Sequence, residues 1–150
     1  MRCWPALVLA LALALSGCGP GQAPQQGLPL EQLRGQWVVI NYWAIWCKPC
    51  IKEIPELNAL DKLPGVTVLG VNYDGVAAQE REQQIQQLGI AFDVLATDPA
   101  TELGINRPVV LPTTLILDPA GELRDTLVGP QTFESLAQAT GQEAASGAHE

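Results

Sequence analysis

The sequence predicts a single α/β domain in which a central mixed β-sheet carries helices on both faces. The chain has 150 residues, a length that suits one domain. Segments with the apolar pattern of buried strands alternate along it with segments of helical periodicity. The last two predicted strands are joined by a short turn and therefore run antiparallel, so we expect a mixed sheet.

The first half of the domain contains two strands and two helices. Residues 37–43 are nearly all apolar, as in a strand that is covered on both faces. Residues 50–63 place leucine and isoleucine at helical spacing, and residues 66–71 form a second apolar run. A polar helix is predicted over residues 77–88, ending at Gly89, where a C-cap glycine belongs.

The second half of the domain is predicted to close the sheet. Residues 92–95 form a short strand, and a loop or short helix follows up to residue 106. Residues 113–117 are a buried strand, and the turn after them returns the chain over residues 122–128. Thr132 is the expected N-cap of a last helix.

The two ends of the chain lie outside this domain, which we place at residues 36–140. Residues 1–17 have a short positive start and a ten-residue apolar run, which is typical of a secretory signal and too short for a transmembrane helix of about 20 residues. The Leu-Ser-Gly-Cys sequence that ends at Cys18 resembles a bacterial lipobox, which implies lipidation of Cys18 and a membrane anchor. An ordinary signal peptide with a chance cysteine is the alternative. Residues 18–35 suit a flexible tether, and residues 141–150 a flexible tail.

Composition excludes several classes of function. His149 is the only histidine, which argues against Cys-His proteases, Ser-His-Asp triads and Cys2His2 zinc sites. The formal net charge is −8 and the basic residues are scattered, so we expect no nucleic-acid partner.

The motif that carries chemistry is Cys47-Lys48-Pro49-Cys50, placed where the first strand passes into the first helix. The helix N-terminus favours negative charge and so stabilises a thiolate at Cys47, and Lys48 adds a positive charge nearby. Two intervening residues let the sulfur atoms meet within one helical turn. The pair is therefore predicted to cycle between dithiol and disulfide without a cofactor or metal; a static disulfide or half of a metal site is the alternative.

The segment WAIWCKPC resembles the active-site segment of the thioredoxin fold. Pro55 lies where that family kinks its first long helix, and Leu111-Pro112 resembles the segment that carries its cis-proline. The resemblance implies that Trp46, Leu111 and Pro112 shape substrate docking.

Finer features resemble the TlpA/ResA-like group, which are membrane-anchored, extracytoplasmic thiol-disulfide oxidoreductases. Asn41 stands where thioredoxin has a buried aspartate, and Glu53 lies one helical turn after Cys50. The resemblance implies that Cys47 is the exposed nucleophile and Cys50 the shielded resolving cysteine. Glu53 would be a proton acceptor for Cys50, or else a solvated helix residue.

The resemblance favours a monomeric reductase of exported proteins in the bacterial cell envelope, facing the periplasm and supplied by a membrane thiol electron donor. Some members of the group act in cytochrome c maturation. Lys48 and Pro49 would modulate the reduction potential of the cysteine pair, but they do not decide whether the protein reduces or oxidises its clients. A periplasmic disulfide oxidase or isomerase is therefore an alternative. A Cu(I)-binding chaperone is a further alternative, and so is a lipoprotein with an inert disulfide. A peroxidase is disfavoured because Ala44 stands where that chemistry needs Thr or Ser.

Overall fold

The computed structural model describes residues 30–142. The predicted signal peptide, the lipidation site Cys18 and most of the predicted tail lie outside these residues. Within them, no helix is long and apolar enough to cross a membrane. The elements in chain order are η1 (Leu30–Leu33), β1 (Trp37–Trp43), α1 (Lys48–Leu60), β2 (Val66–Asn72), α2 (Ala78–Leu88), β3 (Asp93–Val94), β4 (Thr113–Leu117), β5 (Leu123–Val128) and α3 (Phe133–Ala139).

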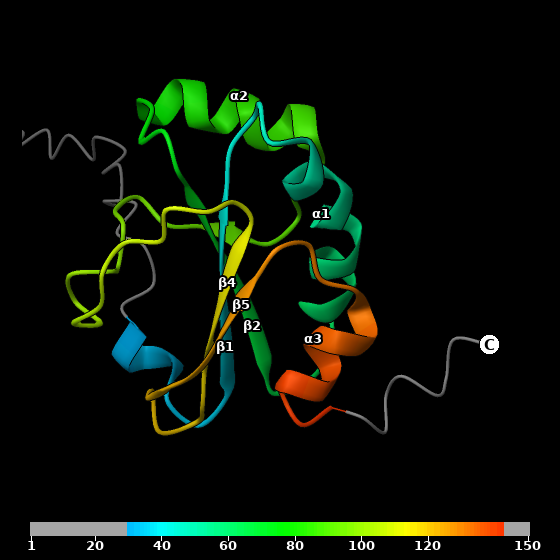
Figure 1. The fold of residues 1–150 in the computed structure, drawn as a ribbon, viewed down its shortest axis with the longest axis vertical. Coiled ribbons are helices and arrows are strands. Elements are labelled where there is room, and N and C mark those ends of the chain that lie inside the picture. The colour runs from blue at the N-terminus through cyan, green and yellow to red at the C-terminus, as the bar shows by residue number, and fades with distance from the viewer. Residues whose placement is uncertain (1–29, 143–150) are drawn as a thin grey trace, which may run out of the picture.

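The five strands form one mixed sheet in the order β3-β2-β1-β4-β5 (Figure 1). β1 pairs parallel with β2, and β2 pairs parallel with β3. β4 runs antiparallel to both of its neighbours, β1 and β5. Every residue of β1 after Trp37 is buried, which explains why its sequence is almost uniformly apolar.

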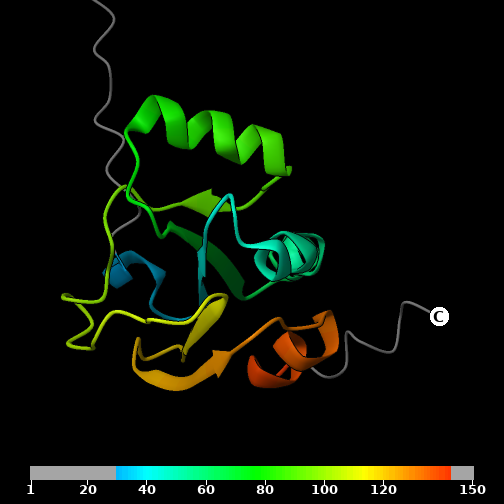
Figure 2. The same cartoon turned by 45° about the horizontal axis from the view of Figure 1, so that its top comes forward.

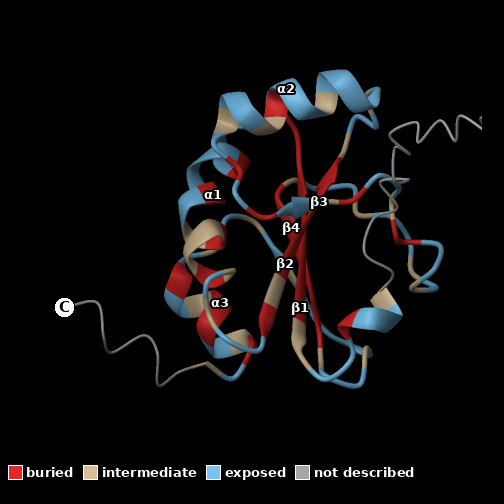
Figure 3. Ribbon diagram, turned by 180° about the vertical axis from the view of Figure 1, so that it is seen from behind, coloured by how far each residue is buried: buried red, intermediate tan, exposed pale blue. Residues whose placement is uncertain are grey.

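Helices α1 and α3 lie side by side on one face of the sheet, and α2 lies across the β3 edge (Figure 2). Ile85 and Leu88 of α2 pack against the same apolar cluster as α1 and α3. The buried strands form the centre of the molecule, and the outer side of α2 faces solvent (Figure 3).

The opposite face of the sheet is covered by η1 and by the segment of residues 95–111. Both faces are therefore covered, as predicted, but the second cover is largely irregular. Residues 99–104 form a single helical turn, in which the Leu103 N–H donates to the Pro99 carbonyl at 2.9 Å. Gly104 ends that turn in the left-handed conformation (φ 65°).

Most element boundaries lie within one residue of the predictions, and the larger differences are at the start of the domain and in α1. The domain begins before residue 36, because Leu33 of η1 is only 6% exposed and packs on the second face of the sheet. Helix α1 begins at Lys48 rather than at residue 50, and it ends at Leu60. Leu63 nevertheless packs against the core from the turn beyond the helix, which is why the helical periodicity extends too far.

The predicted ends of α2 and α3 are confirmed. Gly89 caps α2 in the left-handed conformation, with φ 67°. The Thr132 hydroxyl accepts a hydrogen bond from the Ser135 N–H at 3.3 Å, and the Ser135 hydroxyl accepts one from the Thr132 N–H. This reciprocal capping box fixes where α3 begins.

Candidate active site

A disulfide joins Cys47 and Cys50 at the junction of β1 and α1. Cys47 is the N-cap of α1, and its Sγ accepts a hydrogen bond from the Cys50 N–H at 3.3 Å. The prediction of an exposed Cys47 is wrong for this oxidised form, because Cys47 is only 4% exposed and Cys50 only 1%. Both residues pack into the apolar cluster between α1 and the sheet, although Cys47 remains the more accessible of the two.

The first turn of α1 gives Cys47 an environment that favours negative charge. It contains no acidic residue, and Lys48 and Pro49 are both exposed there. The free N–H groups of a helix N-terminus stabilise a thiolate at the N-cap when the disulfide is reduced. Cys47 is the cysteine of the pair that occupies this N-cap position.

Glu53 is buried, not solvated, and lies on the face of α1 that also buries Cys50. The Asn41 amide donates a hydrogen bond to Glu53 Oε1, and the Gln131 N–H donates one to Oε2 at 2.8 Å. The same Asn41 amide donates to the Thr114 hydroxyl at 3.0 Å. Burial raises the pKa of Glu53 to about 7. The hydrogen bonds from the Gln131 N–H and the Asn41 amide favour the carboxylate and only partly offset this effect. A carboxyl group that titrates near neutral pH therefore lies one helical turn from Cys50.

Trp46 immediately precedes Cys47 in the chain, and the Leu111–Pro112 pair immediately precedes β4. Trp46 is 61% exposed, and its indole N–H donates to the two carboxylate oxygens of Asp74 at 2.9 and 3.2 Å. The Leu111–Pro112 peptide bond is cis. Leu111 packs against the cluster that contains both cysteines, and the Pro112 carbonyl accepts a hydrogen bond from the Gly129 N–H at 2.9 Å.

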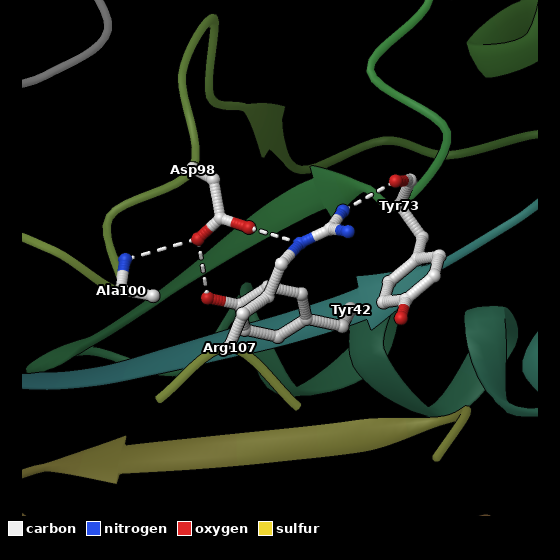
Figure 4. A network of polar contacts seen from close by, with 5 residues as sticks. All are labelled: Tyr42, Tyr73, Asp98, Ala100 and Arg107. Carbon is white, nitrogen blue, oxygen red and sulfur yellow. Dashed lines mark hydrogen bonds and ion pairs between the residues drawn. The ribbon is translucent and has the colours of Figure 1, made fainter. Parts of the chain in front are cut away.

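A polar network holds the segment of residues 95–111 against the sheet (Figure 4). The Asp98 carboxylate accepts hydrogen bonds from the Tyr42 hydroxyl at 2.7 Å and the Ala100 N–H at 2.9 Å, and it pairs with Arg107 at 2.7 Å. The Arg107 guanidinium also stacks on the Tyr73 ring, 3.9 Å from its centroid, and donates to the Tyr73 carbonyl. We call these five residues the Arg107 network.

Charge states in the Arg107 network follow from its contacts. Burial and the hydrogen bond to Asp98 raise the pKa of Tyr42, which therefore remains a hydrogen-bond donor. Burial opposes ionisation of Asp98, but hydrogen bonds from Ala100, Tyr42 and Arg107 outweigh it and lower the pKa of Asp98. The network thus holds an ionised carboxylate beside a guanidinium.

Several of these residues carry no signal in the sequence. Gln131 and Glu53 form a hydrogen bond although they are 78 positions apart in the sequence. Arg107 and Tyr73 form one although they are 34 positions apart. Asp74 contacts Trp46 from the loop after β2. No local pattern marks such pairs, because only the tertiary fold brings them together.

No group of three or more His, Cys, Asp or Glu side chains suited to a metal ion occurs within residues 30–142. Cys47 and Cys50 are the two soft ligands that this site would offer when reduced. What the arrangement provides directly is a disulfide at a helix N-terminus with a buried carboxyl group on the same helix.

Comparison with known proteins shows what the chain is similar to. The AhpC/TSA family model matches residues 17–126. The chain is 32% identical over 114 residues to the thioredoxin-like protein YneN of Bacillus subtilis, which covers 73% of this chain and 66% of that protein. It is 33% identical over 110 residues to the thiol-disulfide oxidoreductase ResA of Geobacillus kaustophilus, covering 71% and 63%. The chain thus spans just under two thirds of the length of these two relatives.

The crystal structure of StoA from Bacillus subtilis is similar to this fold, with a TM-score of 0.57 and 28% identity. The match covers 71% of this chain and 84% of StoA. The predicted thioredoxin-like α/β fold is therefore confirmed.

Proposed function

The chain belongs to the AhpC/TSA family, and we propose that it is a thiol-disulfide oxidoreductase that reduces disulfides in exported proteins. The observation that carries the proposal is the Cys47–Cys50 disulfide at the N-terminus of α1, with buried Glu53 on the same helix face. The similarity to proteins named as thiol-disulfide oxidoreductases supports it.

The first step starts from the reduced dithiol. The Cys47 thiolate attacks one sulfur of a client disulfide, and the client's S–S bond breaks. A mixed disulfide forms between Cys47 and the client, and the client's other sulfur leaves as a thiolate that takes up a proton from water. The N-terminus of α1 keeps Cys47 ionised for this attack.

The second step uses Cys50 and Glu53. The Cys50 thiol passes its proton to the Glu53 carboxylate, and the resulting thiolate attacks Cys47 Sγ. The mixed disulfide breaks, the client's second thiolate is released, and Cys47 and Cys50 form the disulfide seen in the structure. The client gains two electrons and the protein loses two, so a thiol electron donor must reduce the protein again.

The proposed location rests on residues outside the described region. The signal-like residues 1–17 and the lipobox-like sequence at Cys18 support an envelope lipoprotein that faces the periplasm and stays near a membrane donor. We propose that it works as a monomer and that its clients are polypeptides. Apocytochrome c, with its haem-site cysteines, is one candidate client.

Trapping clients in cells tests this function. With Cys50→Ser, the second step is blocked, so Cys47 should remain joined to its client and yield adducts that reductant dissolves. Cys47→Ser and the double variant are matched controls that should yield none. Adducts with exported proteins are the expected result; a Cys50→Ser protein without Cys47-dependent adducts would overturn the proposal.

A further inference from the structure

A cavity of about 350 Å³ lies between the end of β2, the first turns of α2 and the segment of residues 95–107. We call it the Arg81 pocket, after the arginine that lines it together with Val71, Leu95, Ile105 and Arg107. No residue of its lining belongs to the apolar cluster that contains the two cysteines. Its volume is in the range of small-molecule sites, so it is a candidate second site of this molecule.

The Arg81 pocket lies where two parallel strands end. β2 ends at Asn72 and β3 at Val94, and the two strands run parallel. Asn72 lines the pocket, and so does Leu95, which directly follows β3. The carboxyl ends of parallel strands are the common position of ligand sites in open α/β sheets, because the chain leaves the sheet there and opens a crevice.

Arg81 is a partly buried cation without a counter-charge. Within residues 30–142 it is the only basic residue that is partly buried, since the others are all exposed. No ion pair or hydrogen bond of its side chain occurs within the same residues. Positions 77, 78, 84 and 85, its neighbours one turn away on α2, hold no acidic residue. A charge that is partly removed from water without a partner is unfavourable, and an anionic ligand would supply the partner.

Arg107 brings a second guanidinium group to the Arg81 pocket. Its Nε pairs with Asp98 and its Nη2 donates to the Tyr73 carbonyl, but Nη1 has no hydrogen-bond partner in the part of the chain that the structure describes (Figure 4). Asp98 is the one acidic residue of the lining, and both of its oxygens already accept hydrogen bonds. Arg107 balances its charge, so the charge of Arg81 is left in excess, in a chain whose net charge is −8.

The rest of the lining is mixed. The hydroxyl groups of Thr97 and Thr101 are exposed there, and they can donate hydrogen bonds to an oxyanion. Val71, Leu95 and Ile105 supply apolar surface. The Arg81 pocket therefore offers donors and positive charge for a charged head group, and apolar side chains for a carbon skeleton.

We propose that the Arg81 pocket binds a small organic oxyanion, either a carboxylate or a phosphate ester. Its head group pairs with Arg81 and with Nη1 of Arg107, and its carbon part contacts Val71 and Leu95. Guanidinium groups suit this role, because their planar arrangement of N–H donors matches carboxylate and phosphate oxygens. The inference does not depend on the oxidoreductase function and adds a ligand site that the dithiol chemistry does not use.

Three four-carbon probes test the inference: butyrate, butyl phosphate and the uncharged butyramide. Each is titrated into the oxidised, ¹⁵N-labelled full chain, and the backbone amide signals are followed by NMR. We expect at least one of the two anions to shift the signals of residues 95–107 in a saturable way, and butyramide to bind at least about tenfold more weakly. The anion that binds more tightly identifies the head group.

Arg81→Gln keeps most of the side-chain stem and removes the charge, and it should weaken binding of that anion at least about tenfold. Arg124→Gln on the exposed β5 is the matched control, because it removes the same charge outside the pocket. It should bind within about twofold of the wild type. Thermal unfolding shows whether Arg81→Gln is folded; if it is not, the comparison of the anions with butyramide on the wild type still decides.

Three outcomes would overturn the inference. The first is a wild type for which neither anion gives saturable shifts in residues 95–107. The second is butyramide binding as tight as that of the anions, which would make the cavity apolar only. The third is a folded Arg81→Gln protein that binds as the wild type does, or an Arg124→Gln protein that loses as much affinity, since either would show that Arg81 does not recognise the anion.

Discussion

Glu53 on α1 and Asn41 on β1 share a buried hydrogen bond, which joins the helix of the dithiol to the central strand of the sheet. The Asn41 amide cannot accept a proton from a thiol, but the Glu53 carboxylate to which it donates a hydrogen bond can accept one. Thr114 on β4 and the Gln131 N–H complete the polar surroundings of this pair. Glu53 is the only ionisable group among Glu53, Asn41, Thr114 and the Gln131 N–H, so it is the one member of this set that can exchange a proton.

The first prediction concerns the pH dependence of the resolving step. The pKa of Glu53 is about 7, so the rate at which Cys50 resolves a mixed disulfide should rise as pH passes through that value. Glu53→Gln should remove this rise and slow resolution about 100-fold at pH 8. Rapid-quench measurement of the mixed disulfide between pH 5 and 9 checks this.

Glu56→Gln is the matched control for that experiment, because Glu56 also lies on α1 and also accepts a backbone hydrogen bond, from Phe133 at 3.1 Å. It should keep the wild-type pH profile. A Glu53→Gln protein with the wild-type profile would show that Cys50 loses its proton to another acceptor.

The second prediction concerns stability. Glu53 has its pKa raised from 4.5 to about 7 in the folded protein. Between those values the folded state binds more protons than the unfolded state, so the free energy of unfolding falls as pH rises. The fall should amount to about 3 kcal/mol in total and should level off above about pH 8, where Glu53 is ionised in both states. Urea unfolding of the oxidised protein measures it, and Glu53→Gln should lack this contribution; equal slopes in the two proteins would contradict the assignment.

The third prediction concerns the Arg107 network. Arg107→Ala removes an ion pair, a ring contact and a hydrogen bond to a backbone carbonyl. We expect a loss of about 1–2 kcal/mol in the free energy of unfolding. A double-mutant cycle with Asp98→Asn should show coupling of about 1 kcal/mol, and Arg124→Ala on exposed β5 should change stability by less than about 0.5 kcal/mol. If the losses in the free energy of unfolding from Arg107→Ala and Asp98→Asn simply add, the interaction between the two side chains contributes nothing to stability.

The fourth prediction concerns Gly70 in β2. A Cβ at this position would lie 2.8 Å from Trp43 Nε1 and 3.1 Å from the side chains of Phe92 and Val94. Gly70→Ala should therefore destabilise the protein by about 1–3 kcal/mol. Without that crowding, alanine would stabilise the strand by about 0.5–1 kcal/mol, so the sign of the change in urea unfolding decides the matter.

Much of the fold follows from local pattern. The apolar runs of β1, β2 and β4 mark buried strands, and their predicted limits lie within one residue of the observed ones. The caps at Gly89 and Thr132 are also local signals, and both are confirmed. The start of α1 is less clear in the sequence, because its N-cap is Cys47, a residue type that is not a usual cap.

The cover of the second face could not be predicted in the same way. Residues 95–111 have no sustained periodicity, and they are held by contacts such as Tyr42 with Asp98, which are 56 positions apart. Helical spacing placed Glu53 one turn from Cys50, but it did not predict the burial of Glu53. That burial depends on Asn41 and on the Gln131 N–H, which come from distant parts of the chain.

The reduction potential of the Cys47–Cys50 pair tests the central claim most directly. It is measured by equilibrating the protein with glutathione buffers and counting the free thiols. A reductase of protein disulfides should have a potential of about −200 mV or lower, towards the value of thioredoxin. A potential above about −150 mV, with the reduced form favoured, would contradict the claim and identify the protein as an oxidase or isomerase of disulfides.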